Sequence, residues 1–202
     1  MKVYCATGNP GKLREFHLAG EVLGIDVEPL PDIKQIVAPA ETGATFDENA
    51  RIKAEYYSRF APGPLFADDS GLEVDALGGA PGVYSARYAG EHATDQQNNE
   101  LLLRNLRDQQ NRAARFVCVI ALAGNGKTIR TFRGEVEGQI IHEPRGPSGF
   151  GYDPLFYYKP FSCTFGEVDG PRKFNVSHRG HALKQLLAYL SDPRSFDCGV
   201  AY

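Results

Sequence analysis

The sequence predicts an α/β protein built around a mixed β-sheet. Residues 2–6 form a short β-prone run that stops at a glycine-containing loop, and a helix pattern follows from Lys12. Residues 115–123 are almost continuously apolar, which is typical of a central strand covered on both faces. Asn125-Gly126 then predicts a tight turn into the alternating run 128–136, which favours an antiparallel partner strand.

Three helices have recognisable start signals. Thr45 and Glu48 fit a capping box, in which the two side chains satisfy free backbone N–H groups at the helix start. Thr94 and Gln97 repeat that pattern before a run of leucines. A last helix is predicted from near Ser177, because leucines follow at the spacing of one helix face: Leu183, Leu186, Leu187 and Leu190.

The composition favours one globular chain. Its 202 residues are 42% hydrophobic and 23% charged, which is enough apolar material for a core. The net charge of −3 gives no overall positive field for nucleic acid, and no apolar stretch is long enough for a membrane helix. The first residues lack the apolar run of a signal peptide, so we expect a cytoplasmic protein. Single cysteines are expected as unpaired thiols: Cys5, Cys118, Cys163 and Cys198.

The loop between the first strand and the first helix is a candidate phosphate site. Thr7-Gly8-Asn9-Pro10-Gly11-Lys12 places flexible backbone, a hydroxyl group and a lysine at a helix N-terminus. Exposed N–H groups and the helix dipole favour an anion there. The spacing is not that of a Walker A loop, and Leu13 stands where that motif needs Ser or Thr. An ordinary strand-to-helix turn is the alternative.

Two adjacent carboxylates form a second candidate site. Asp68-Asp69 follow the short apolar strand 65–67 and are expected at its end, before a loop rich in glycine at 71–90. Further acids stand nearby in the sequence: Glu41, Glu73 and Asp75. Mg2+ is commonly held by one or two carboxylates, with water and phosphate oxygens completing its shell. The alternative is a solvated acidic turn.

Aromatic and basic residues in the second half suggest a place for a planar ligand. In Gly149-Phe150-Gly151-Tyr152-Asp153, an aromatic ring between two glycines can present its face for stacking. Lys173 and Ser177-His178-Arg179-Gly180 bring hydrogen-bond donors to a helix start, where they could contact keto oxygens of a base. The alternatives are a turn with core aromatics and a basic surface cluster. Together the four motifs supply what a nucleoside triphosphate needs.

These motifs, in this order, resemble the non-canonical purine nucleoside triphosphate pyrophosphatases, also called inosine triphosphate or dITP/XTP pyrophosphatases. The resemblance covers about residues 2–190. It is carried by Ala6–Lys12, Glu41–Gly43, Phe46-x-Glu48-Asn49-Ala50, Ala67–Leu72, Gly79–Tyr88, Gly149–Pro154 and Ser177–Gly180.

The resemblance implies an elongated mixed sheet flanked by helices, in two lobes with the active site in a central cleft. The chain would be one domain, residues 1–202, without a separable boundary and with a tail at 191–202 that shows no periodicity. Such enzymes are usually homodimers. They hydrolyse ITP, dITP or XTP to the monophosphate and pyrophosphate with Mg2+, and neither a nucleic acid nor a membrane partner is implied.

The resemblance also implies roles for individual residues. Asp69 would be a Mg2+ ligand and the proton acceptor, and Glu41 would be a second Mg2+ ligand. The substrate-binding positions would be Thr7, Gly8, Asn9, Pro10, Gly11, Lys12, Ser70, Phe150, Gly151, Tyr152, Asp153, Lys173, His178 and Arg179.

The sequence departs from the family pattern near the site, because Phe174 follows Lys173 where members typically have Asn. Two rival interpretations stay open. One is a related pyrophosphatase that acts on another base, and the other is a non-catalytic nucleotide sensor, which would have no need of the acid pair Asp68-Asp69.

Overall fold

The computed structural model describes residues 2–192, which form a seven-stranded mixed sheet in the order β2-β1-β3-β4-β5-β6-β7. Strand β1 pairs in parallel with β2 and β3, and the other neighbours are antiparallel. The strands are β1 Lys2–Cys5, β2 Asp26–Pro29, β3 Leu65–Val74, β4 Ala113–Gly124, β5 Lys127–Ile140, β6 Phe156–Tyr158 and β7 Cys163–Thr164. The helices are α1 Pro10–Leu23, α2 Phe46–Tyr57, α3 Asp95–Asn105, α4 Gly170–Val176 and α5 His178–Ser191.

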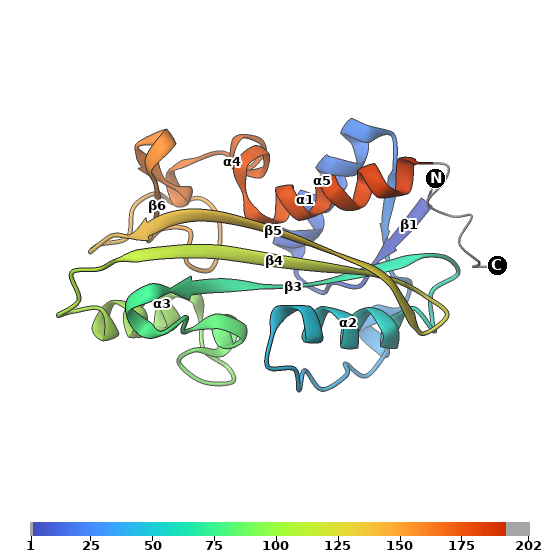
Figure 1. The fold of residues 1–202 in the computed structure, drawn as a ribbon, viewed down its shortest axis with the longest axis horizontal. Coiled ribbons are helices and arrows are strands. Elements are labelled where there is room, and N and C mark those ends of the chain that lie inside the picture. Colours follow the sequence, from blue (N-terminus) through green and yellow to red (C-terminus); the bar gives the residue numbers. More distant parts are fainter. Residues whose placement is uncertain (1, 193–202) are drawn as a thin grey trace.

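Helices cover both faces of the sheet (Figure 1). Helices α1 and α5 pack on one face over a core that contains Phe16, Phe66 and Leu186. Helix α2 packs on the opposite face, over Leu65 and Val119. The mixed α/β architecture predicted from the sequence is therefore confirmed.

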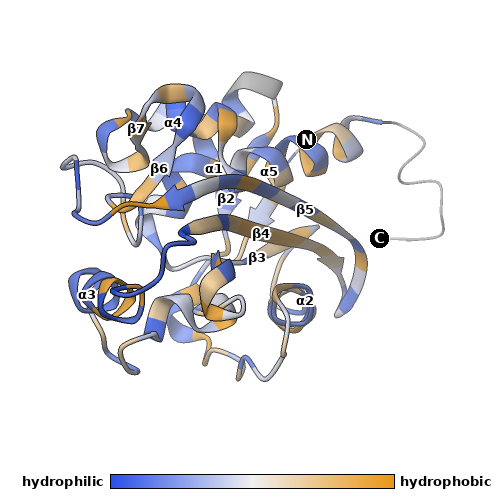
Figure 2. Cartoon of the chain, turned by 60° about the vertical axis from the view of Figure 1, so that its left-hand side comes forward, coloured by the Kyte–Doolittle hydropathy of each residue, from blue (hydrophilic) through white to orange (hydrophobic). Residues whose placement is uncertain are grey.

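The sheet extends beyond these helices to a third apolar cluster. Strands β3, β4, β5 and β6 meet there with α3, and the cluster contains Leu102, Phe116 and Phe156. Strand β4 is buried along nearly its whole length, as its apolar run predicts, and it lies in the hydrophobic middle of the molecule (Figure 2). The prediction of two lobes joined in one domain stays a prediction.

The predicted helix starts are confirmed. Both capping boxes are formed, at Thr45 and at Thr94, and the Ser177 hydroxyl caps α5 by accepting from the Gly180 N–H. The Asn125-Gly126 turn joins β4 to β5, and both residues have the positive φ angles that a type I′ turn requires.

The predicted end of the strand at residue 67 was wrong. Strand β3 continues to Val74, because β4 pairs with it from Leu65 to Val74. Asp68 and Asp69 therefore lie inside a strand, and the glycine-rich loop begins only after it. Gly71 suggested a loop, but here it permits close packing: a Cβ at Gly71 would overlap the hydroxyl of Ser85. Pairing with β4 overrode the local signal.

The short elements β2, β6, β7 and α4 were not predicted, since each has seven residues or fewer and lacks a full period of the apolar pattern. Of the predicted tail, residues 193–202 lie outside the described residues, as does Cys198. Cys5 and Cys118 are buried and unpaired, as expected. No helix among the described residues is long and apolar enough to cross a membrane.

Candidate functional site

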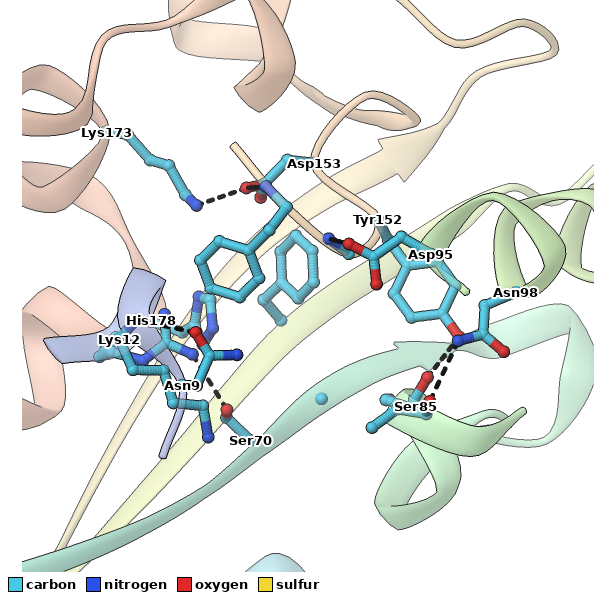
Figure 3. A pocket seen from close by; sticks show the side chains of 16 residues that line it. Asn9, Lys12, Ser70, Ser85, Asp95, Asn98, Tyr152, Asp153, Lys173 and His178 are labelled. Atoms are coloured by element: carbon cyan, nitrogen blue, oxygen red, sulfur yellow. Dashed lines mark hydrogen bonds and ion pairs between the residues drawn. The ribbon is translucent and has the colours of Figure 1, made fainter. Parts of the chain in front are cut away.

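A cavity of about 230 Å³ lies where β1 ends and β3 continues. Elements from the whole chain contribute to it, and Figure 3 shows Asp95 and Asn98 of α3 across the cavity from Asn9, Lys12 and His178. Its lining residues are Asn9, Lys12, Ser70, Gly71, Ser85, Ala86, Asp95, Asn98, Phe116, Phe150, Gly151, Tyr152, Asp153, Lys173, His178 and Arg179.

The two adjacent carboxylates point to opposite faces of the sheet, because side chains alternate along a strand. Asp68 is buried on the face of α1 and α5, with its Oδ2 2.8 Å from the Nζ of Lys12. Asp69 lies on the face of α2, with its Oδ1 2.7 Å from the Nζ of Lys53. The pair is thus neither a solvated turn nor a joint ligand for one ion.

The candidate phosphate loop opens α1 as expected. The side chain of Asn9 caps the helix and accepts hydrogen bonds from the N–H groups of Gly11 and Lys12. Burial alone would raise the pKa of Asp68, but Lys12 and Arg179 outweigh it and hold that pKa at about 2. Asp68 is therefore ionised at neutral pH and keeps the Lys12 ammonium group at the cavity.

Lys53 joins the two predicted metal ligands. Its Nζ lies 2.7 Å from Asp69 Oδ1 and 3.3 Å from Glu41 Oε2, so both carboxylates converge on one cation. Burial would lower the pKa of Lys53, but Asp69, Asp68 and Glu41 raise it overall. Burial raises the pKa of Asp69 more than Lys53 lowers it. The predicted site residues that lie outside the lining of the cavity are Thr7, Gly8, Pro10, Gly11, Glu41 and Asp69.

Buried charges of alternating sign connect the two ends of the cavity. Arg179 donates to Glu15 at 2.5 Å and to the Ser70 hydroxyl at 3.0 Å, and its Nε lies 3.8 Å from Asp68 Oδ2. Glu15 also lies 3.5 Å from the Nζ of Lys173. Burial would raise the pKa of Glu15, but Arg179 and Lys173 lower it, so this carboxylate stays ionised.

The aromatic end of the cavity is the loop that contains Phe150. Lys173 Nζ and the Arg179 guanidinium carbon lie 4.9 and 5.6 Å from the centre of its ring. Gly149 has φ +81° and a Cβ there would overlap Asp153, so only glycine fits. The buried Tyr152 donates its hydroxyl to the Ser85 carbonyl at 2.8 Å, a contact that joins the loop to residues 82–87.

Lys173 and His178 are buried rather than surface residues. Lys173 Nζ lies 2.6 Å from Asp153 Oδ2, which also accepts from the Phe150 N–H. His178 stacks on Phe116 with 4.8 Å between ring centres. Burial and the nearby cations lower the pKa of His178 well below 6.5, so the imidazole is neutral. Its Nδ1 is buried and makes no hydrogen bond to any residue from 2 to 192.

Some predicted candidates do not join the site. Glu73 and Asp75 pair with Arg115 at the far end of β3. Phe174, the departure from the family pattern, packs in the core beside α5 and does not line the cavity. It therefore leaves the cavity wall intact.

Sequence reasoning missed several residues of the site. Lys53 falls on the buried stripe of α2, and a lysine at such a position is a signal that it has an internal partner. Glu15 is the corresponding case in α1. Two further lining residues, Asn98 and Phe116, carried no recognisable signal, and Ser85 lay in the family motif Gly79–Tyr88 without an assigned role.

The cavity has a cationic end and an aromatic end, and outside its lining two carboxylates, Asp69 and Glu41, converge on Lys53. This arrangement is typical of an α/β protein of the nucleotide-binding class. The sequence pattern of the Ham1 family matches residues 3–189. The chain belongs to the Ham1 family.

Similar proteins agree over nearly the whole length. The dITP/XTP pyrophosphatase of Acidobacterium capsulatum is 48% identical over 94% of this chain and 98% of its own. The dITP/XTP pyrophosphatase of Bacillus subtilis is 48% identical over 90% and 92%. The solved HAM1 protein from Coxiella burnetii has a TM-score of 0.86 and 41% identity, over 95% of this chain and 98% of that one.

Proposed function

We propose that this chain is a pyrophosphatase that hydrolyses non-canonical purine nucleoside triphosphates, ITP, dITP and XTP, to the monophosphate and pyrophosphate. The names of its curated relatives and its family support this activity. The observation that carries the proposal is the split of Asp68 and Asp69, which provides one carboxylate to hold Lys12 and another to act on a water molecule.

The phosphates would bind at the end of β1. Lys12 and the backbone of residues 7–11 lie at the N-terminus of α1, where the helix dipole favours an anion. Lys53 adds a second cation on the other side of β3. A triphosphate that starts in the cavity would therefore extend between two ammonium groups, which neutralise its charge and hold it in line.

Asp69 and Glu41 would hold Mg2+. Their convergence on a single cation fits such an ion, and Asp69 Oδ2 is buried without a hydrogen-bond partner in the described part of the chain. Among the described residues no group of three or more His, Cys, Asp or Glu could hold a metal, so phosphate and water oxygens would have to complete the shell, as Mg2+ commonly requires. When bound, the ion offsets the charge that builds on the leaving pyrophosphate.

The reaction would be an attack of water on the α-phosphorus. The water oxygen forms a bond to that phosphorus, the bond to the bridging oxygen of the β-phosphate breaks, and Asp69 takes up the proton. The raised pKa of Asp69 suits a general base, because a more basic carboxylate is a better proton acceptor. Asp68, held by Lys12 and Arg179, would keep its charge and position those cations.

Base selection would come from donors at the aromatic end. Arginine and lysine only donate, so Arg179 and Lys173 suit the 6-keto oxygen of hypoxanthine or xanthine and oppose the 6-amino group of adenine. Phe150 would stack on the base. His178 stays neutral and can donate from one ring nitrogen.

The proposal includes the homodimer and the cytoplasmic location that the resemblance implies. Sedimentation equilibrium of the purified chain is expected to give twice its mass. A mass equal to one chain would refute the homodimer and leave the proposed activity untouched.

A substrate panel tests the activity. Purified protein with Mg2+ is expected to release pyrophosphate from ITP, dITP and XTP much faster than from ATP or GTP. A preference for ATP, or release of single phosphate, would refute the proposal. Tight binding of ITP without product in calorimetry would support the nucleotide sensor instead.

A further inference from the structure

The aromatic loop is held by helix α3 as well as by the buried ion pair to Lys173. The N–H of Gly151 donates to Asp95 Oδ2 at 2.6 Å, and its carbonyl accepts from Asn99 Nδ2 at 3.0 Å. Gly151 thus has both of its backbone polar groups bound by side chains of one helix. We call Asp95 and Asn99 the Gly151 clip.

The geometry of α3 explains how two side chains reach one residue. Asp95 and Asn99 are four positions apart and therefore share one face of the helix, one turn apart. Asp95 is the first residue of α3 and accepts as a carboxylate, so its hydrogen bond is the stronger, charge-assisted kind. Gly151 itself has φ +61°, a conformation that the clip stabilises.

The clip fixes one side of Phe150, and Asp153 fixes the other. Asp153 accepts from the Phe150 N–H at 2.9 Å and pairs with Lys173. The backbone at Phe150 is therefore anchored at two points, at its own N–H by Asp153, which pairs with Lys173 of α4, and at Gly151 by the clip from α3. Since the ring has no hydrogen bonds of its own, its direction in the cavity depends on the backbone that carries it and on the Lys173 and Arg179 cations beside it.

We propose that Asp95 and Asn99 are positioning residues that set the affinity for the base by holding the Phe150 ring against it. This inference rests on the proposed function for the identity of the base that Phe150 contacts. Neither residue belongs to the phosphate end, where Lys12, Lys53 and Asp69 lie. Loss of the clip is therefore expected to weaken binding of the nucleoside part and to leave binding of pyrophosphate unchanged.

A purely structural role for Asp95 at the start of α3 is the competing explanation. The helix start is already satisfied without it, because Thr94 and Gln97 form the capping box. Thr94→Ala consequently removes the cap and keeps the clip, while Asp95→Ala does the reverse. If Asp95 only stabilised α3, both variants would lower the melting temperature and neither would act on one ligand alone.

The test measures dissociation constants by calorimetry for inosine monophosphate and, separately, for inorganic pyrophosphate with Mg2+. Asp95→Ala is expected to weaken binding of inosine monophosphate about tenfold, the effect of one charge-assisted hydrogen bond. Asn99→Ala is expected to weaken it about fivefold, the effect of one neutral hydrogen bond, and binding of pyrophosphate is expected to stay within about twofold in both variants. Asp95→Asn keeps an acceptor oxygen and is expected to retain most of the wild-type affinity for inosine monophosphate. Gln96→Ala is the matched control, since the Gln96 side chain bonds Glu100 on the exposed side of α3.

A double-mutant cycle tests whether the clip acts through Phe150. In a Phe150→Ala background, Asp95→Ala is expected to have no further effect on the affinity for inosine monophosphate. A full additional loss there, or equal losses for both ligands, would overturn the proposal. Because these are binding constants, the clip can be supported in a protein that fails the substrate panel, and the panel can succeed while the clip fails.

Discussion

Adjacent residues of a strand face opposite sides of a sheet, and this rule gives Asp68 and Asp69 different partners. Asp68 meets Lys12 and Arg179, and its pKa falls to about 2. Asp69 meets Lys53, which lowers its pKa, but burial raises that pKa more, so it rises overall. Two acidic residues that are adjacent in the sequence therefore lie on opposite faces of β3 and have different partners and proposed roles.

Asp69→Asn is expected to abolish most turnover. The amide cannot accept the proton of the attacking water, and loss of a general base typically costs about 10²- to 10⁴-fold in rate. Steady-state hydrolysis of ITP measures the effect, and circular dichroism checks the fold. Glu73→Gln is the matched control on the same strand, since Glu73 pairs with Arg115, away from the site. Turnover of Asp69→Asn close to the wild-type rate would exclude Asp69 as proton acceptor.

His178 predicts a dependence of stability on pH. Burial and the nearby cations lower its pKa in the folded protein well below 6.5, whereas the unfolded chain takes up a proton near 6.5. Below about pH 6.5 the unfolded chain thus binds more protons at this residue than the folded protein does. As the pH falls below about 6.5, His178 therefore lowers the free energy of unfolding by up to about 1.4 kcal/mol for each pH unit.

His178→Gln is expected to remove this part of the slope, measured by urea unfolding between pH 7.5 and pH 5. The exposed His142 provides the control variant, His142→Gln. Equal slopes for His178→Gln and the wild type would show that the buried imidazole is protonated in the folded state.

At the scale of elements, close approach of α5 to β5 positions the basic residues. A Cβ at Gly134 of β5 would overlap the carbonyl oxygen of His178 and the backbone of Ala182. Glycine therefore lets the first turn of α5 lie directly on the strand, and this brings His178 and Arg179 to the cavity. Gly134 interrupts an otherwise regular strand pattern, which indicates a bulge or a close backbone approach, but the sequence does not show that α5 is the neighbour.

Gly134→Ala is expected to destabilise the protein by about 1–3 kcal/mol, the usual cost of overpacking. It is also expected to raise the KM for ITP, because α5 must shift away from β5. Urea unfolding and steady-state kinetics measure the two effects. Gly124→Ala is the control in the same hairpin, where the new Cβ would meet Ile129 at an ordinary 3.6 Å. If both variants were equally stable, the close approach would not constrain α5.

Elements with strong local signals could be predicted from the sequence. The local residue pattern is sufficient to predict the capping boxes at Thr45 and Thr94 and the turn at Asn125. The extent of β3 could not be predicted, because it depends on pairing with β4, about fifty residues later in the chain. Short elements such as β7 exist only because a neighbour supplies their hydrogen bonds.

At the scale of the whole molecule, the site is a product of topology. Strand β1 pairs with β3 only at Leu65 and Phe66, so the remainder of β3 has room beside it for ligand. The motifs recognised in the sequence mark most of the cavity wall, from Asn9 to Arg179. Partners such as Lys53 and Glu15 are not marked, because only the fold shows which charges meet.

The origin of the oxygen in the products tests the central claim, attack of water on the α-phosphorus. ITP is hydrolysed with Mg2+ in water enriched in oxygen-18, and the products are separated and weighed by mass spectrometry. We expect one labelled oxygen in inosine monophosphate and none in pyrophosphate. Label in pyrophosphate, or labelled single phosphate with inosine diphosphate, would contradict the account.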